Sequence, residues 1–260
     1  VVVDVGEGVH HFNIGDRVSV GADIPCGACT HCQSNRANCC DTNLAIGYQF
    51  DGGYADYILL DPLVVSGGPV HRFGAQLDFR IATLAEPLAC CLNGYERAMM
   101  SPGKIVVIFG AGPIGILLSL LAPTLGATEV TLIDPIPSRL DKARQLTSAR
   151  TLCSSETNPV AEILEVTHGR GADLIFTACP SLEAQLQALE LVAKRGVINF
   201  FGGLPPASHA LTVSSNHLHY REAYLTGSHG STPEQHRRAL QLIETEQVKP
   251  EALITDEYAL

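Results

Sequence analysis

Four cysteines stand close together near the start of the chain and could hold a metal ion. Cys26, Cys29, Cys32 and Cys40 follow the spacing C-x2-C-x2-C-x7-C. Four thiolates so closely spaced in one loop can surround a tetrahedral Zn²⁺ and leave no open coordination position, which is typical of a structural zinc site. Cys39 stands beside Cys40 and would change the last spacing by one residue. We choose Cys40 as the fourth ligand.

An iron–sulfur cluster is the alternative metal group for these cysteines. The bacterial ferredoxin pattern has three residues before its fourth cysteine and a proline after it, whereas this chain has seven residues and then Asp41. The chain has nine cysteines, an odd number, and the expected cytoplasmic location argues against a disulfide framework. Zinc is therefore favoured. The cysteines at 90, 91, 153 and 179 lie in apolar patterns that predict buried core thiols.

A glycine-rich motif further along the chain is typical of dinucleotide binding. The sequence GAGPIG directly follows the apolar run IVVIF and opens a helical pattern. In a G-x-G-x-x-G turn the first glycine makes the tight turn, the second lets the backbone approach a pyrophosphate, and the third lets helix and strand pack closely. We expect Gly110, Gly112 and Gly115 to have these roles. The start of the helix, near Pro113 and Ile114, would face the anion with its backbone N–H groups.

An acidic residue follows this turn at the distance that the dinucleotide fold requires. Asp134 ends the next predicted strand, 24 residues after Gly110. A carboxylate there can accept a hydrogen bond from the ribose 2′-OH and would repel a 2′-phosphate. The acid therefore favours NAD over NADP, although Arg139 nearby could weaken that preference. The alternative, that the glycines only shape a turn and Asp134 only caps a helix, is disfavoured by the complete order of strand, glycines, helix and acid.

The elements that must position these residues follow two patterns. Residues 1–65 predict short strands at VVVDV, RVSV and GYADYILL, separated by Gly and Asp clusters. From about Ile105 strands alternate with helices, the pattern of βαβ units in a parallel sheet. Pro123 predicts that the helix after the glycine-rich turn ends or kinks near Ala122. The last predicted helix begins with Thr232 as its N-cap.

The composition excludes several classes of protein. The 260 residues include 17 Lys and Arg against 27 Asp and Glu, a formal net charge of −10, which disfavours binding to nucleic acid or to an anionic membrane surface. The 46% hydrophobic content excludes an intrinsically disordered chain. Glycines and prolines interrupt the uncharged stretch from Ile105 to Thr128, so it predicts strand, turn and helix rather than a membrane span. No basic-then-apolar segment opens the chain, and we expect a cytoplasmic location.

In combination the motifs resemble the zinc-dependent medium-chain dehydrogenases. The segments GEGVHHFNIGDRVSV and DGGYADYILL are similar to the family's segments on either side of its zinc lobe, and LAEPLACCLNGYERA is similar to the one that enters its cofactor domain. The pair Glu86-Pro87 and the segment NHLHYREAYLTGSHGSTPEQ resemble the polyol branch, the sorbitol dehydrogenases and their threonine 3-dehydrogenase relatives. Ethanol-type alcohol dehydrogenases have a Cys at the place of Glu86. The resemblance covers essentially the whole chain.

The resemblance implies an α/β fold, a doubly wound Rossmann parallel sheet plus a partial β-rich GroES-like catalytic domain. The domains it implies are a partial catalytic domain with the zinc lobe at 1–89, a Rossmann NAD-binding domain at 90–228 and a partial return to the catalytic domain at 229–260. A homo-oligomer, a dimer or a tetramer, is also implied. By analogy the segment AYLTGS would form the sheet edge that makes the contacts.

The activity implied by the resemblance is a zinc-dependent hydride transfer between a secondary alcohol, of the polyol or sugar-alcohol kind, and NAD. Glu86 would face a catalytic zinc, as a direct ligand or through its bound water, and Ala178, Phe201 and Gly202 would line the nicotinamide pocket. Without the resemblance, Glu86 is more simply an acid at a helix N-terminus, where the helix dipole stabilises it. Threonine or another small alcohol remains open as the substrate.

Part of the family's catalytic metal site has no counterpart in this sequence. That zinc also needs a Cys and a His-Glu pair upstream of the position that Val1 matches, and the family's closing helix and strand follow the position of Leu260. Both ends of the chain therefore look cut from a longer protein. A second hypothesis follows, in which the chain is a truncated module that binds NAD and a structural zinc but has no catalytic activity.

Overall fold

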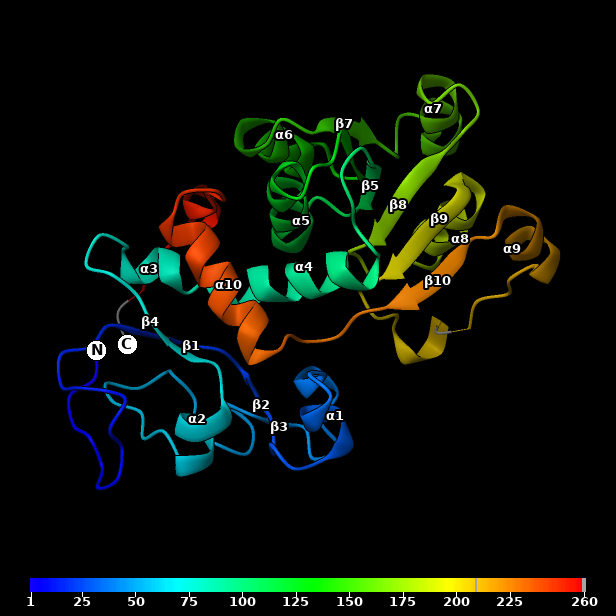
Figure 1. Ribbon diagram of the computed structural model, residues 1–260. Helices are drawn as coiled ribbons and strands as arrows, with labels where there is room; N and C mark the ends of the chain where they lie inside the picture. Colours follow the sequence, from blue (N-terminus) through cyan, green and yellow to red (C-terminus); the bar gives the residue numbers. More distant parts are fainter. Residues whose placement is uncertain (209, 259–260) are drawn as a thin grey trace. The chain divides into compact units, whose positions relative to one another are not determined.

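The computed structural model describes residues 1–208 and 210–258, which form two compact units. The first unit contains Val1–Asn93 and His229–Leu260, and the second contains Gly94–Ser228. The chain leaves the first unit within helix α4 (Ala85–Arg97) and returns to it after strand β10 (Tyr224–Gly227), and both elements are labelled in Figure 1.

A six-stranded parallel sheet forms the centre of the second unit. The strand order is β10-β9-β8-β5-β6-β7, and each neighbouring pair is parallel. If these six strands are renumbered 1 to 6 along the chain, starting with β5, the order read from the β7 edge is 3-2-1-4-5-6. This is the Rossmann arrangement. It confirms the doubly wound sheet predicted from the alternation of strands and helices. The remaining strands are β5 (Ile105–Phe109), β6 (Glu129–Asp134), β7 (Arg150–Cys153), β8 (Ala172–Thr177) and β9 (Val192–Phe200).

Helices connect these strands over both faces of the sheet. After β5 and β6 the chain steps in one direction across the sheet, and after β7 and β8 it steps in the other. Because such crossovers are right-handed, α5 and α6 cover one face, and α7 and α8 cover the opposite face. The helices of this unit are α5 (Pro113–Thr124), α6 (Pro137–Leu146), α7 (Pro159–Val166), α8 (Leu182–Leu191), η2 (Pro206–Ser208) and α9 (Ser215–Arg221).

The central strands are apolar because helices cover both of their faces. Strand β8 is buried at every position, and β5 is buried from its second residue to its end. Tyr95, near the end of α4, is 1% exposed, donates its hydroxyl to the carbonyl oxygen of Leu118 at 2.8 Å, and packs edge-on against the ring of Phe176. This packing joins α4 to α5 and to β8 one residue before the end of that strand.

The uncharged stretch that begins at Ile105 forms β5 and α5, as predicted. Helix α5 ends at Thr124 rather than near Ala122, so Pro123 lies inside its last turn. Proline has no N–H, but the N–H of Leu125 still donates to the carbonyl oxygen of Leu121, and this closes the helix one residue after the proline. Within residues 1–208 and 210–258, no helix combines the length and the apolar character needed to cross a membrane.

Short elements build the first unit. Strand β1 (Val18–Val20) pairs antiparallel with β4 (Val70–Arg72), and β2 (Asp23–Ile24) pairs antiparallel with β3 (Leu44–Ala45). Helix α10 (Pro233–Glu244) begins at Thr232, and Gln235 completes a capping box there. The predicted N-cap is therefore confirmed. The other elements are α1 (Thr30–Gln33), η1 (Ala37–Cys39), α2 (Pro62–Gly67), α3 (Phe79–Ala82) and η3 (Glu251–Leu253).

Two strands predicted in the first unit are not formed. Residues 1–5 and 53–60 have no strand conformation. The segment 53–60 has the alternation of a strand, but a strand needs a partner for its backbone N–H and C=O groups. In the described part of the chain no backbone group pairs with this segment, and Tyr54 and Tyr57 are exposed. The prediction of a strand at GYADYILL was wrong for this reason. The prediction at VVVDV was also wrong, because its backbone pairing is limited to Val2, which bonds to Gly15 and Asp16 without forming a ladder.

Candidate functional site

The four predicted cysteines come together in the first unit. Their sulfur atoms all lie within 4.8 Å of one another. The Sγ of Cys32 lies 3.5 Å from that of Cys29 and 3.9 Å from that of Cys26. Four sulfurs at about 2.3 Å from a tetrahedral Zn²⁺ lie roughly 3.8 Å from one another. The sulfur positions therefore fit a tetrahedral metal ion.

Turns and short helices place these sulfurs. Gly27 has a φ of 72°, in the left-handed region that favours glycine, and it turns the chain between Cys26 and Cys29. Cys29 is the N-cap of α1, and Cys40 follows η1. Backbone N–H groups point at two of the sulfurs, because Cys26 donates to the Sγ of Cys40 at 3.3 Å and Cys29 donates to the Sγ of Cys26 at 3.4 Å. Such donors stabilise thiolates.

Burial and backbone donors have opposite effects on these thiols. Burial raises the pKa of Cys40, but backbone N–H groups of Cys26, Asn43 and Thr42 outweigh it and lower the pKa to about 6. Burial and the neighbouring thiols raise the pKa of Cys32 to about 12. The protein groups alone therefore favour a mixture of thiolate and thiol. A divalent cation would remove this conflict, because a coordinating thiol is deprotonated.

Cys39 does not join this group. Its side chain is exposed, whereas Cys40 is 7% exposed and has its sulfur beside the other three. The remaining cysteines also lie outside the group. Cys91 and Cys153 are buried, and Cys90 and Cys179 are half-buried.

The glycine-rich turn joins β5 to α5 in the second unit. Gly110 has a φ of 106°, and a Cβ on it would lie 2.8 Å from the carbonyl oxygen of Ala178. A Cβ on Gly115 would lie 1.8 Å from the carbonyl oxygen of Gly110, so a side chain cannot fit there. Apart from the chain neighbours of Gly112, no atom of residues 1–208 and 210–258 lies within 4 Å of the place where a Cβ on it would be. The first and third glycines are therefore required by packing, and the second leaves open space that fits a phosphate group.

Helix α5 begins inside this turn. Gly112 is its N-cap and Pro113 is its first residue. Gly112 has no side chain to cap the first turn, and the helix dipole places partial positive charge at this end. Pro113 is exposed and Ile114 is half-buried beside the open space at Gly112. An anion can bind at such a helix start.

Asp134 ends β6 and is tied to the glycine-rich turn. Its Oδ2 accepts the backbone N–H of Ala111 at 2.9 Å, and its Oδ1 accepts that of Ile136 at 2.9 Å. Nη1 of Arg139 lies 3.7 Å from Oδ2. The side chain of Asp134 is 2% exposed and that of Arg139 is 56% exposed. The carboxylate is nearly covered, but each of its oxygens can accept a second hydrogen bond, so capacity for a ribose hydroxyl remains.

The residues predicted beside the nicotinamide lie at the carboxyl ends of β8 and β9. The N–H of Ala178 donates to the last carbonyl of β5 at 2.8 Å, and the N–H of Gly202 donates to the carbonyl oxygen of Thr177 at 2.7 Å. A Cβ on Gly202 would lie 3.0 Å from the backbone nitrogen of Cys179. Phe201 directly follows β9, which ends at Phe200. In open α/β sheets this carboxyl edge is where ligands bind.

Glu86 lies in the first turn of α4, in the first unit. Burial raises the pKa of Glu86, the thiol of Cys90 opposes this by donating to Oε1 at 3.5 Å, and the negative charge of Asp23 adds to the rise. The four cysteines are the one group of three or more metal-ligating side chains found close together among residues 1–208 and 210–258. The described residues therefore do not complete a second metal site around Glu86.

Two contacts of these residues were missed from the sequence. Cys90 follows Glu86 by four residues, and this helical spacing could have indicated that the two side chains meet. The hydrogen bond from Ala111 to Asp134 depends on how β5 and β6 are aligned, which no local pattern specifies.

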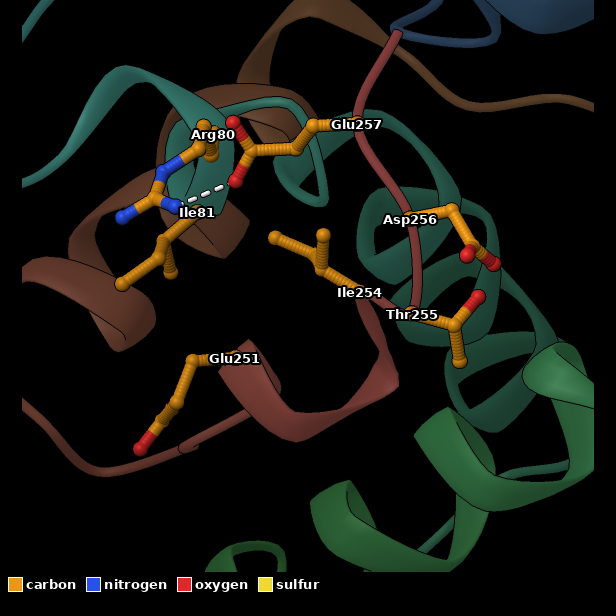
Figure 2. A pocket seen from close by; sticks show the side chains of 7 residues that line it. All are labelled: Arg80, Ile81, Glu251, Ile254, Thr255, Asp256 and Glu257. Carbon is orange, nitrogen blue, oxygen red and sulfur yellow. Dashed lines mark hydrogen bonds and ion pairs between the residues drawn. The ribbon is translucent and has the colours of Figure 1, made fainter.

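An open pocket of about 310 Å³ lies in the first unit beside α3. Figure 2 shows Arg80 and Glu257 pointing toward one another, and the two form an ion pair. No residue predicted from the sequence as a site residue lines this pocket, and its carboxyl groups outnumber its one guanidinium. It therefore has no part in the candidate site. The lining residues are Arg80, Ile81, Glu251, Ile254, Thr255, Asp256 and Glu257.

Two family models match parts of this chain. The family model for the alcohol dehydrogenase GroES-like domain matches residues 1–66, and that for zinc-binding dehydrogenase matches residues 113–245. The first match confirms the GroES-like part of the predicted fold class.

Among curated proteins, the chain is 30% identical to the sorbitol dehydrogenase of Halalkalibacterium halodurans over 100% of this chain and 74% of that protein. It is 34% identical to the D-altritol 5-dehydrogenase of Agrobacterium fabrum over 94% of this chain and 70% of that protein. Among solved structures, it is similar to a protein of Sinorhizobium meliloti 1021 described as a zinc-binding dehydrogenase and bound to NADP. That similarity has a TM-score of 0.87 and 30% identity, over 95% of this chain and 71% of that chain.

Proposed function

The chain belongs to the polyol branch of the zinc-dependent medium-chain dehydrogenases, a family of alcohol oxidoreductases, and we propose that it transfers hydride between a sugar alcohol and NAD. The names of the two relatives, sorbitol dehydrogenase and D-altritol 5-dehydrogenase, support a secondary hydroxyl of a polyol as the reacting group. The observation that carries the proposal is the open space at Gly112 beside the carboxylate of Asp134, at the carboxyl edge of the sheet. A dinucleotide needs both features together.

The choice of NAD rests on Asp134. Its carboxylate can accept a hydrogen bond from a ribose hydroxyl and would repel the 2′-phosphate of NADP. Two observations favour NADP instead. Arg139 lies 3.7 Å from that carboxylate, and the Sinorhizobium meliloti protein is bound to NADP. The buried position of Asp134, held by two backbone N–H groups, keeps the negative charge at the ribose site whether Arg139 points toward it or away.

The residues of this chain bind and orient the reactants. The nicotinamide, when bound, supplies the hydride chemistry. Gly110, Gly112 and Gly115 shape the turn for the pyrophosphate, and the start of α5 stabilises its charge. Asp134 accepts a hydrogen bond from a ribose hydroxyl. The nicotinamide lies beside the carboxyl ends of β8 and β9, at Ala178, Phe201 and Gly202. By resemblance, Glu86 would be a ligand of a catalytic zinc, directly or through a water, and that zinc would polarise the substrate hydroxyl.

Three further parts complete the proposal. Cys26, Cys29, Cys32 and Cys40 hold one structural zinc, because four mutually close sulfurs leave no open coordination position. Residues 1–89 and 229–260 belong to the catalytic domain, and 90–228 form the NAD-binding domain. The protein is a homo-oligomer that associates through the sheet edge at β10, which has one neighbouring strand in the sheet.

An activity assay on the purified chain tests the proposal. Zinc content is measured first, and reduction of NAD⁺ and of NADP⁺ is then followed with sorbitol, D-altritol and L-threonine. We expect turnover with a sugar alcohol and a kcat/KM for NAD⁺ at least about tenfold above that for NADP⁺. Turnover with L-threonine alone, or with NADP⁺ alone, would contradict it. Binding of NADH and one zinc without turnover would support the alternative, a module without catalytic activity.

A further inference from the structure

The segment by which the chain returns to the first unit is held by residues near the four cysteines. We define the return segment as residues 229–231, which follow Ser228, and the cysteine lobe as residues 23–45, from β2 to β3. Asn38 of the lobe donates its Nδ2–H to the carbonyl oxygen of His229 at 2.9 Å. Asp23 of the lobe accepts the backbone N–H of Ser231 on its Oδ2 at 3.1 Å. Two side chains of the lobe therefore hold opposite ends of the return segment.

The middle of the return segment is pressed against the same carboxylate. Gly230 has a φ of 58°, and a Cβ on it would lie 2.3 Å from Oδ2 of Asp23. Only a glycine can lie that close in this backbone conformation. The contact is therefore tight packing between the lobe and the return segment, beyond the two hydrogen bonds.

The point where the chain leaves the first unit is held to the same segment. Asn93, the last residue of the first unit before the second begins, is 4% exposed. Its Nδ2 donates to the carbonyl oxygens of His229 at 3.2 Å and Gly230 at 3.0 Å, and its Oδ1 accepts from Gln235 at 3.4 Å. The carbonyl oxygen of His229 therefore accepts hydrogen bonds from two side-chain amides, that of Asn93 in α4 and that of Asn38 in the lobe.

The lobe contacts are close in sequence to the proposed metal ligands. Asn38 precedes Cys40 by two residues, and Asp23 precedes Cys26 by three. Around Asn38 the lobe has little of its own to keep the chain in place, since neither α1 nor η1 has a buried residue. Asp23 is held better, because Ile24 beside it is 1% exposed, but β2 and β3 pair over two residues only. A metal ion is the group that orders such a lobe, because its binding free energy is coupled to the folding of the ligands.

We propose that the cysteine lobe is a metal-dependent clamp on the return segment. Zinc at the four cysteines orders the lobe, the lobe fixes Asn38 and Asp23, and these two side chains hold residues 229–231 where the chain comes back from the second unit. The inference rests on the proposed zinc site. By this inference the metal stabilises the position of residues 229–231 as well as its own loop.

Amide hydrogen exchange at Ser231 tests the clamp, because this N–H donates to Asp23. The full chain is compared with zinc bound and after removal of zinc by a chelator. We expect exchange at Ser231 to become roughly tenfold faster without zinc, as a hydrogen bond to a charged group is lost. Exchange at Val107 in β5 should stay unchanged and shows that the second unit is intact.

Two variants separate the clamp from a general loosening. With zinc bound, Asn38→Ala should speed exchange at Ser231 several-fold, and removal of zinc should then add less than it does in the unaltered chain, because the two changes release the same contact. Gln33→Ala changes an exposed residue of the same lobe and should have no effect. Asp23→Asn is the second variant if Asn38→Ala does not fold, and it should also speed exchange with zinc bound.

Different failures point to different errors. One outcome would overturn the clamp alone. In it the chain binds one zinc, and the chelator speeds exchange at lobe amides such as that of Cys40 but leaves exchange at Ser231 unchanged. Equal effects of zinc removal in the unaltered chain and in Asn38→Ala would also overturn it. Absence of bound zinc in a folded chain would overturn both the proposed metal site and the clamp.

Discussion

The backbone N–H of Ala111 donates to the carboxylate of Asp134 at 2.9 Å, so the glycine-rich turn and the acid at the end of the next strand form one hydrogen-bonded unit. The alignment of the two strands makes this possible. Phe109, the last residue of β5, lies opposite Ile133 of β6, so the turn after β5 lies beside Asp134 at the end of β6. A buried carboxylate that accepts two backbone N–H groups stabilises the fold as well as the site. Asp134 therefore has two roles that a substitution can separate.

Replacing Asp134 should affect both stability and cofactor affinity. Asp134→Ala leaves the N–H groups of Ala111 and Ile136 without their acceptor, and we expect a loss of about 2 kcal/mol in the free energy of unfolding. Asp134→Asn keeps one of the two acceptor oxygens, so it should lose less stability than Asp134→Ala and still fold, with NADH affinity lowered about tenfold by loss of the charged acceptor for the ribose. Denaturant unfolding and NADH fluorescence titration measure the two effects. The control Asp141→Asn, on an exposed part of α6, should change neither. Unchanged NADH affinity in Asp134→Asn would remove this residue from the proposed site.

Gly112→Ala and Gly115→Ala should fail in different ways. A methyl group at Gly112 has open space around it, so the variant should fold with nearly unaltered stability but lose NADH binding, because the methyl fills the space of the pyrophosphate. A methyl group at Gly115 would overlap the carbonyl oxygen of Gly110, so that variant should be destabilised by about 2 kcal/mol or more. Thermal unfolding together with NADH titration distinguishes them. Normal NADH affinity in Gly112→Ala would contradict the position of the pyrophosphate.

The parts of the site that are local in sequence could be predicted without the structure. The cysteine spacing places four thiols within one loop, and the glycine-rich motif needs only a strand before it and a helix after it. The parallel sheet could be predicted because strands alternate with helices from about Ile105, and because β5 has the continuous apolar sequence of a strand covered on both faces.

The parts that depend on a distant partner could not be predicted. The alternation in 53–60 shows which side chains a strand would bury, but not whether another strand is present to pair with it. The contacts of Asn93 and Asp23 with the return segment join residues more than a hundred positions apart. Asparagine and aspartate are also common on surfaces, so their residue types alone gave no signal. Such contacts follow from packing, which pattern analysis does not describe.

The adjacent cysteines Cys39 and Cys40 should differ in metal binding. Cys40→Ser removes a sulfur from the group of four and should reduce bound zinc from about one per chain to well below one. Cys39→Ser changes an exposed side chain outside the group and should leave zinc content and thermal stability unaltered. Elemental analysis of both purified variants, prepared without added metal, measures this. Loss of zinc in Cys39→Ser with zinc retained in Cys40→Ser would reverse the assignment.

Two histidines of the first unit share a hydrogen bond whose direction is fixed by its surroundings. The Nδ1 atoms of His71 and His236 lie 3.0 Å apart, and Nε2 of His236 lies 3.4 Å from Oγ of Ser19. Ser19 donates its hydroxyl hydrogen to the carbonyl oxygen of Ala82, so it accepts from Nε2–H of His236. Neutral His236 then accepts at Nδ1 from His71. A proton added to Nδ1 of His236 would face the N–H of His71, so the pair disfavours a charged His236.

This pair should make the first unit sensitive to acid. Burial, with a smaller contribution from His71, lowers the pKa of His236 to about 4, and burial also lowers that of His71. In the unfolded chain both titrate near 6.5, so the unfolded state binds more protons below that pH. The free energy of unfolding should therefore be highest above pH 6.5 and fall by up to about 3 kcal/mol from His236 alone as the pH drops toward 4. Urea unfolding at pH 7.5, 6 and 5 measures the slope. His236→Gln should flatten it, whereas His10→Gln, at an exposed position, should not. An unaltered slope in His236→Gln would show that other groups cause the acid sensitivity.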